Sequence, residues 1–303
     1  MRLPLRFHTL DVFTNRKFAG NPLAVVEDAD GLTDAEMLAI AREFNLSETV
    51  FLQSPRDPVN SARARIFTPG GELPFAGHPT IGAAVLLAET RAGEVLSRHG
   101  VVIVLEEPIG VLRCEVIRAR AGASFAQFAA PAPPEKLGPA PTSDVLARAL
   151  SLEPQDIGFG AHSPTLYSAG LPLTFVPLRS REALDRARKA PASFPAAMGA
   201  TRGAYLYTHE TMDETNAIQA RMFAYGLGFD EDPGTGSAAA AFAGVALEFE
   251  RPEDGEHEIF IEQGHKMGRP SRITLRMDVE GGRLACVHIG GQAVRVSEGV
   301  LKP

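Results

Sequence analysis

Two segments of this chain resemble each other, and their repetition constrains the fold more than any other feature. Arg65–Ala84 and Arg221–Ala240 each read as a strand, a loop with an acidic residue, a Gly-rich turn and a helix of small residues. Both begin with Arg-x-Phe, and the two starts lie 156 positions apart in a chain of 303 residues. We therefore expect two related halves that share a cleft. Because each turn ends at a helix N-terminus, where N–H groups are unpaired and the helix dipole is positive, the cleft is expected to hold a small anion.

Composition limits the class of protein and of partner. With 45% hydrophobic residues, the chain is long enough for two domains with real cores. The formal charge of −7 and the lack of a dense Lys/Arg run argue against nucleic-acid and anionic-membrane partners, which need clustered positive charge. We therefore expect a small-molecule partner.

Cysteine usage and the absence of an export signal point to the cytoplasm. Cys114 and Cys286 are far apart and lack a Cys-x-x-Cys spacing, so neither a disulfide framework nor a thiolate zinc site is indicated. The N-terminus has no sustained apolar region, and the longest apolar run, Ser237–Leu247, is too short to span a bilayer. A cytoplasmic protein is the expectation.

Local patterns predict most of the regular elements. Thr33 with Glu36 three residues later forms a capping box for a helix that stops at Asn45. A second helix is expected over Ser143–Leu150. Strands are expected from β-branched and aromatic runs bounded by Gly and Pro, over residues 7–26 (two strands), 48–52, 101–105, 111–117, 171–177, 203–208, 273–277, 285–289 and 293–296.

Two helices are apolar or small on every side, namely Thr80–Ala88 and Ser237–Phe249. A helix without a polar face must be surrounded by protein. The predicted fold class is therefore α+β, with two like domains, each a curved mixed sheet around a central apolar helix. The Pro- and Ala-rich residues 131–141 read as an extended connector.

The domain boundary is placed near residue 125. We expect an N-terminal domain over residues 1–125 and a C-terminal domain over 126–303, with residues 290–303 able to pack back on the first domain.

The first Gly-rich turn contains a histidine. In Gly77–Thr80, Pro79 stands near the first turn of the helix, where its missing N–H costs nothing, and Gly77 lets a ligand approach the backbone. His78 is expected either to face the cleft or to cap its own helix or lie satisfied in the core. Glu72, upstream, reads as a solvated loop residue.

The second turn adds an acid and a hydroxyl. Ser237 is a candidate ligand for the substrate, or only an N-cap, and Asp232 with Glu231 could serve only to favour the helix N-terminus. A dinucleotide site is disfavoured because the acidic pair would repel a pyrophosphate and no βαβ context follows.

Glu48 stands at the entrance of a predicted strand. Beside an anion-binding cleft and partly desolvated, a glutamate gains a raised pKa and can exchange protons near neutral pH. Cys114 reads as core filler on the apolar face of its strand, and Cys286 as similar. The chain contains no His-Glu-x-x-His, P-loop or Gly-x-Ser-x-Gly pattern, which weakens metalloprotease, NTPase and hydrolase interpretations.

At these positions the chain resembles the PhzF-like isomerases of phenazine biosynthesis, which share the fold of diaminopimelate epimerase. The blocks that carry the resemblance occur in the family's order and span nearly the whole chain: residues 11–14 with 20–22, 47–51, 73–80, 231–238 and 263–271. The resemblance implies two domains of like fold with the active site between them. It also implies a homodimer.

The family also implies cofactor-free proton transfer, here on a small carboxylate-bearing substrate. No metal site is expected. By this resemblance Glu48 is the acid/base, and His78, Asp232 and Ser237 hold the substrate or relay protons. The anion-binding turns would be supplied by Gly77, Thr235 and Gly236.

Departures from the family leave alternatives open. Related racemases place a cysteine at each helix N-terminus to invert a carbon, whereas these turns carry Gly77-His78 and Asp232-Pro-Gly. Tyr225 stands where proline is expected, and Gly234 where alanine or valine is usual. An amino- or hydroxy-acid epimerase or racemase is one alternative, and a non-catalytic binding protein for small acids is another.

Overall fold

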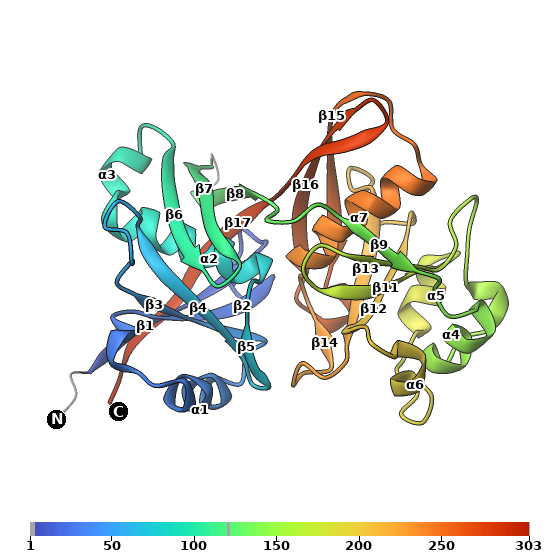
Figure 1. The fold of residues 1–303 in the computed structure, drawn as a ribbon, viewed down its shortest axis with the longest axis horizontal. Helices are drawn as coiled ribbons and strands as arrows, with labels where there is room; N and C mark the ends of the chain where they lie inside the picture. The colour runs from blue at the N-terminus through green and yellow to red at the C-terminus, as the bar shows by residue number, and fades with distance from the viewer. Residues whose placement is uncertain (1–3, 120–121, 303) are drawn as a thin grey trace. The chain divides into compact units, whose positions relative to one another are not determined.

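The computed structural model describes residues 4–119 and 122–302 (Figure 1). Contacts group the chain into two compact units, unit 1 with Met1–Pro131 and Gly290–Pro303, and unit 2 with Ala132–Ile289. No helix among the described residues is long and apolar enough to cross a membrane.

Unit 1 is a closed barrel of eight strands. Its strands are β1 (Leu5–Val12), β2 (Asn21–Val26), β3 (Glu48–Gln53), β4 (Ala62–Thr68), β6 (Val101–Glu107), β7 (Gly110–Arg118), β8 (Ser124–Ala129) and the C-terminal part of β17 (Arg283–Leu301). Consecutive pairings run β1–β2–β3–β4–β6–β7–β8–β17 and return from β17 to β1. The short β5 (Gly71–Leu73) pairs with β4. Closure leaves the interior free for one helix.

That helix is α2 (Gly77–Arg91), which contacts β1, β2, β3, β6, β7 and β8. Every residue from Gly77 to Ala88 is buried, which confirms the central helix expected from its lack of a polar face. A Cβ at Gly82 would lie 2.4 Å from Leu23 Cδ2, so a side chain at this position would force Leu23 of β2 to shift. The remaining helices of unit 1 are α1 (Asp34–Phe44), α3 (Gly93–Leu96) and the 3-10 turn η1 (Ala29–Gly31).

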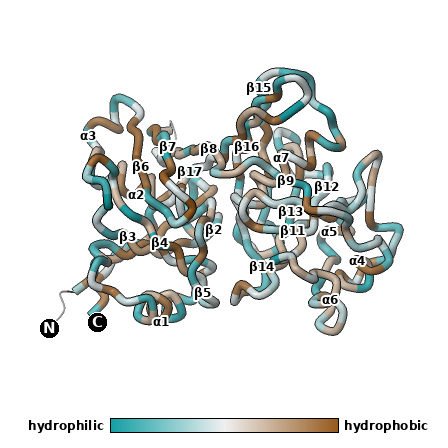
Figure 2. The backbone as a smooth tube through the Cα atoms, viewed as in Figure 1, coloured by the Kyte–Doolittle hydropathy of each residue, from teal (hydrophilic) through white to brown (hydrophobic). Residues whose placement is uncertain are grey.

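Helix α1 shows how local sequence sets a helix. Thr33 and Glu36 form both hydrogen bonds of the capping box, and Asn45 ends the helix in the left-handed conformation at φ 51°. Both were predicted, and both are confirmed. Along the tube of α1 hydrophobic and hydrophilic residues alternate, because one face meets the core and the other meets water (Figure 2).

Unit 2 repeats this plan with additions. Its strands are β9 (Glu135–Gly138), β10 (Thr165–Ser168), β11 (Pro172–Pro177), β12 (Gly203–Thr208), β13 (Ile218–Ala224), β14 (Glu231–Asp232), β15 (Gly255–Gln263), β16 (Ser271–Glu280) and the start of β17. The central helix α7 (Gly236–Phe249) contacts β9, β10, β11 and β16. Unit 2 also has three short helices, α4 (Ser143–Leu150), α5 (Arg181–Arg186) and α6 (Phe194–Met198), which contribute to an apolar cluster of their own. Its two 3-10 turns among the described residues are η2 (Pro154–Asp156) and η3 (His265–Met267).

The connector prediction for residues 131–141 is wrong in part. Residues Glu135–Gly138 form β9, which pairs antiparallel with β10. The prolines that suggested a connector flank this segment, so the missing N–H groups fall outside the paired residues. Strand prediction also missed that the tail is one strand, β17, where separate short runs were expected over residues 285–289 and 293–296.

The repeat is visible at atomic detail. In each unit an antiparallel strand pair leads into the central helix, and a strand parallel to the first of the pair follows: β4, β5, α2, β6 and β13, β14, α7, β15. Glu106 and Glu262, 156 positions apart, each accept hydrogen bonds from loop N–H groups and from an asparagine, Asn60 and Asn216 respectively. Such coincidence of backbone and side-chain detail supports a duplicated scaffold.

Candidate functional site

In unit 1 the candidate residues gather at the N-terminus of α2. Gly77 is the first residue of the helix, and the N-cap Ala76 makes no side-chain cap. His78, buried, sits in the first turn, and its Nδ1 lies 3.0 Å from Nδ2 of Asn21 on β2. His78 therefore does not cap its own helix. The amide of Asn21 donates to Nδ1, so the proton of the neutral ring is on Nε2.

Glu48 lies on the other side of the histidine. It is the first residue of β3, where the parallel pairing with β2 places it beside Leu23. Its Oε2 is 3.4 Å from His78 Nε2, and both side chains are buried. Within unit 1 the structure thus brings Glu48 and His78 together.

Burial fixes the protonation of the histidine. Desolvation lowers the pKa of His78 from 6.5 to about 3, so the ring is neutral at neutral pH. A neutral imidazole with its proton on Nε2 can donate a hydrogen bond toward Glu48, but it is a poor source of positive charge. Of this pair, the carboxyl group is the one suited to exchanging protons.

In unit 2 the candidate residues form a hydrogen-bonded turn before α7. The hydroxyl of Thr235 donates to Asp232 Oδ2 at 2.6 Å. Gln263, at the end of β15, accepts from the Thr235 N–H at 3.2 Å and donates to the backbone carbonyl of Asp232 at 2.7 Å. These bonds hold the turn and fix the orientation of the Asp232 carboxylate.

Ser237 is the second residue of α7 and is buried, whereas the N-cap is Thr235. The alternative that Ser237 only caps the helix is therefore wrong. Gly236 is the first helical residue, as Gly77 is in α2. By position, Ser237 in unit 2 corresponds to His78 in unit 1.

In unit 2 the structure adds two residues that sequence reasoning missed. Gln263 is the first residue of the block 263–271, one of those that carry the resemblance. The signal available in the sequence was the glycine that follows it. Gly264 has φ +78°, and a Cβ there would lie 2.6 Å from the Pro233 carbonyl oxygen, so the position favours glycine. Tyr205, fully buried, has a raised pKa, first from burial and then from the charge of Asp232, so it stays a phenol. No local pattern marked Tyr205.

The comparison with known proteins identifies the family. The chain matches the family described as phenazine biosynthesis-like protein, PhzC-PhzF, over residues 10–299. The chain belongs to this family. An uncharacterised isomerase of Mesorhizobium japonicum is 48% identical over 299 residues, covering 96% of each chain. The trans-2,3-dihydro-3-hydroxyanthranilate isomerase of Pseudomonas aeruginosa is 34% identical, covering 97% of this chain and 98% of that one.

Among solved structures, a PhzF-family phenazine biosynthesis protein of Bacillus anthracis superposes with a TM-score of 0.87 at 28% identity and covers 100% of both chains. The predicted fold class, two units of the diaminopimelate epimerase-like kind, is confirmed. Because its family relatives are named isomerases, this PhzF-family chain is an enzyme of the isomerase class.

Two glutamates have a structural role that was not predicted. Glu72, expected to be solvated, forms a bidentate ion pair with Arg65, whose two N–H donors lie 2.8 and 2.6 Å from its carboxylate oxygens. Glu231, for which favouring the helix N-terminus was one alternative, forms the same kind of pair with Arg221 at 2.8 and 2.9 Å. In this PhzF-family chain the repeated Arg-x-Phe start thus marks a repeated ion pair.

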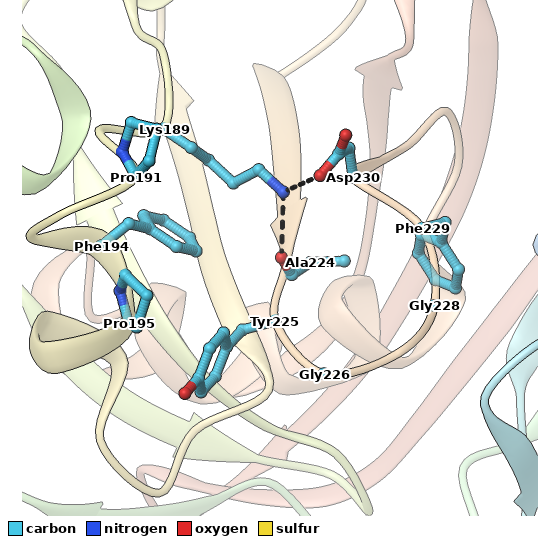
Figure 3. Close-up of a pocket in the computed structure, with 10 residues that line it drawn as sticks. All are labelled: Lys189, Pro191, Phe194, Pro195, Ala224, Tyr225, Gly226, Gly228, Phe229 and Asp230. Atoms are coloured by element: carbon cyan, nitrogen blue, oxygen red, sulfur yellow. Dashed lines mark hydrogen bonds and ion pairs between the residues drawn. The ribbon is translucent and has the colours of Figure 1, made fainter.

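A pocket of about 620 Å³ lies in unit 2 of the PhzF-family fold, lined from residues 189–195 and 224–230 (Figure 3). Lys189 extends across it and donates to Asp230 Oδ1 at 2.5 Å. Tyr225, the departure noted from the family pattern, forms part of the wall. None of the candidate site residues is among the described residues that line this pocket.

Proposed function

We propose that this chain is a cofactor-independent isomerase that moves a proton between carbons of a small carboxylic acid, with Glu48 as both base and acid. The observation that carries the proposal is the buried Glu48 carboxyl group 3.4 Å from Nε2 of a neutral His78. A buried carboxyl held in one orientation is suited to accept a proton from carbon and to return it.

The proposed step balances with a single group. The Glu48 carboxylate takes a proton from an acidic carbon of the substrate: the C–H bond breaks, an O–H bond forms, and the electron pair is delocalised into the substrate's unsaturated system. The same carboxyl group then returns the proton to another carbon on the same face. No external oxidant, reductant or second base is required.

His78 and Asn21 serve this step by positioning. Asn21 donates to Nδ1 and so keeps the proton on Nε2, where it can stabilise the Glu48 carboxylate. Removing that donor would change the tautomer of His78 without removing the base.

The remaining candidate residues are proposed to bind the substrate. The first-turn N–H groups at Gly77 of α2 and at Gly236 of α7 suit a carboxylate, since they lie at positive helix ends. The Ser237 hydroxyl and Thr235 add neutral polar contacts. Asp232 would repel a carboxylate, so we assign it to a donor on the substrate, an amine or a hydroxyl.

Deuterium exchange tests the proposal directly. The protein is incubated in D₂O with a panel of small unsaturated, amino and hydroxy acids, and mass spectrometry measures deuterium gain. The first compound is trans-2,3-dihydro-3-hydroxyanthranilate, because the Pseudomonas aeruginosa relative is named as its isomerase. Product formation, with or without deuterium, by the native protein and not by Glu48→Gln supports the proposal. Full turnover by Glu48→Gln would refute the role of Glu48.

An epimerase is the second candidate, because unit 2 offers a second buried carboxylate in Asp232. Inversion needs an acid and a base on opposite faces, so it would use Glu48 with Asp232. A two-thiol racemase is disfavoured: Cys114 lies in β7 with its pKa raised by burial, and Cys286 lies in β17, so neither cysteine belongs to the first turn of α2 or α7. Loss of optical activity from a chiral acid would favour the epimerase, and a tightly bound acid that is never transformed would favour a binding protein.

A further inference from the structure

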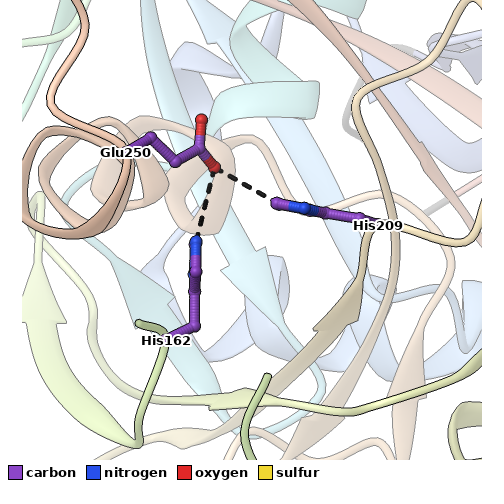
Figure 4. A group of neighbouring side chains, drawn as sticks. All are labelled: His162, His209 and Glu250. Atoms are coloured by element: carbon purple, nitrogen blue, oxygen red, sulfur yellow. Dashed lines mark ion pairs between the residues drawn. The ribbon is translucent and has the colours of Figure 1, made fainter. Parts of the chain in front are cut away.

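Three metal-ligating side chains converge in unit 2, apart from the residues assigned above (Figure 4). Glu250 Oε1 lies 3.3 Å from His209 Nε2 and 3.9 Å from His162 Nε2. One ligand atom from each residue lies within 4.8 Å of the other two. The three come from separate segments: His162 from the loop after η2, His209 from the end of β12, and Glu250 from the end of α7.

The distances between the ligand atoms suit a metal ion with tetrahedral coordination. Metal–ligand bonds of about 2.0–2.1 Å place neighbouring ligand atoms about 3.3–3.5 Å apart in a tetrahedron. The 3.3 Å separation already has this value, and the 3.9 Å separation exceeds it by a few tenths of an ångström. His209 and Glu250 are partly exposed, with 47% and 39% of their side chains accessible, so both can adjust. Two imidazoles and a carboxylate would leave a fourth position for water.

The orientation of His162 is an independent observation. Its Nδ1 lies 2.9 Å from the hydroxyl of the fully buried Tyr207, and its ring stacks on Phe159 at 4.6 Å between centroids. In the tautomer whose Nδ1–H donates to the Tyr207 oxygen, the lone pair on Nε2 is left to bind a metal ion beside Glu250. A partner that fixes the far ring nitrogen is the usual companion of a metal-ligating histidine.

The end of α7 favours a cation at this place. Glu250 is the C-cap of α7, and the last turn of the helix contains no basic residue. Helix C-termini carry partial negative charge, which attracts cations. Ser237 is in the first turn of the same 14-residue helix, about 20 Å away along its axis. The cluster is therefore distinct from the turn assigned to substrate.

We propose that His162, His209 and Glu250 form a binding site for one divalent transition-metal ion of the Zn²⁺ type. The ligand atoms are Nε2 of each histidine and a carboxylate oxygen of Glu250, and Tyr207 positions His162. A competing cluster, Asp278 with Cys286 and His288, includes a thiol 3.7 Å from an imidazole nitrogen. The test must therefore separate the two.

The test measures Zn²⁺ binding by equilibrium dialysis of the full chain after chelator treatment, with metal content read by mass spectrometry. We expect one Zn²⁺ per native chain. His209→Gln and Glu250→Gln should each weaken binding at least about tenfold, and because both side chains are partly exposed, circular dichroism should show an unchanged fold. Tyr207→Phe keeps all three ligands and should weaken binding by about 10- to 100-fold, as loss of a positioning partner does.

Two controls make the result decisive. His99→Gln removes an exposed histidine of unit 1, and Cys286→Ser removes the thiol of the competing cluster; neither should change Zn²⁺ affinity. Co²⁺ in place of Zn²⁺ should show tetrahedral visible absorption without a thiolate charge-transfer band. Absence of stoichiometric binding, binding retained in both His209→Gln and Glu250→Gln, or a thiolate band lost with Cys286→Ser would each overturn the proposal.

Discussion

The two units share a scaffold but differ at the position of the proposed base. Strand register makes Glu48 and Gly203 equivalent, because the next residues, Thr49 and Ala204, each pair with the phenylalanine of the repeated Arg-x-Phe start. Gly203 has φ +151°, and a Cβ there would lie 2.2 Å from the Phe223 carbonyl oxygen. Unit 2 therefore has no room for a side chain where unit 1 carries its carboxylate. The two units thus share the same arrangement of strands and central helix, while the local backbone conformation determines which unit can carry the carboxylate.

A second equivalent pair shows the same divergence in polarity. Glu107 and Gln263 lie 156 positions apart at the ends of β6 and β15. Glu107 accepts a hydrogen bond from Thr80 at 2.7 Å, and burial raises its pKa from 4.5 to about 8. Gln263 makes its bonds to the turn before α7 with an uncharged amide. One unit thus keeps a titrating group where the other has a neutral one.

The largest expected effect concerns catalysis. Glu48→Gln removes the proposed acid/base and should lower kcat by about 10²- to 10⁴-fold, the usual contribution of such a group. Asp232→Asn removes a proposed binding group and should chiefly raise KM. Steady-state kinetics on the substrate found by deuterium exchange measures both, with the exposed Glu43→Gln as the control. Equal losses of kcat for Glu48→Gln and Asp232→Asn would contradict the assignment of acid/base chemistry to Glu48 alone and would favour a two-base epimerase.

The next effect concerns the steric difference between the units. Gly203→Ala combines an unfavourable φ with a backbone clash and should lower the free energy of unfolding by about 2–5 kcal/mol. Gly71→Ala is a matched control, because Gly71 has φ +149° but no atom within 4 Å of the place that a Cβ would occupy. Chemical denaturation gives the free energy of unfolding of both variants, and the difference between them is the contribution of the backbone clash. Equal destabilisation would show that strain alone excludes a side chain at Gly203.

A pH dependence should follow from Glu107. Its folded-state pKa of about 8 exceeds its ordinary value of 4.5, so ionisation opposes folding as pH rises between these values. This group should lower the free energy of unfolding by about 3–4 kcal/mol from pH 5 to pH 9. Glu107→Gln, which copies the neutral residue of unit 2, should remove that loss. Denaturation curves at the two pH values measure it, and an unchanged pH dependence in the variant would contradict the assignment.

The smallest effect compares the two arginine–glutamate pairs. Arg221 also donates to the backbone carbonyls of Leu184 and Ala187, and Glu231 is less exposed than Glu72, at 18% against 32% of the side chain. Glu231→Gln should therefore cost about 1–3 kcal/mol of stability, whereas Glu72→Gln should cost about 1 kcal/mol or less. Thermal denaturation of both variants gives the ranking. A larger loss for Glu72→Gln would reverse it.

The sequence by itself determined the local and periodic features. Thr33 with Glu36 set the start of α1, and the lack of a polar face showed that α2 and α7 are enclosed. The 156-residue offset revealed the duplication, and the quoted blocks revealed the family. These features depend on neighbouring residues or on hydrophobic period, which a linear sequence records.

Only the tertiary structure decided which polar groups meet. Asn21, Glu48 and His78 come from three separate elements, and parallel pairing of β2 with β3 beside α2 brings them together. Likewise Gln263 reaches Asp232 from a separate strand, β15, on the far side of α7 in the sequence. Separation along the chain does not specify which side chains share the inside of a closed sheet. That is set by strand register and burial, which also make His78 neutral.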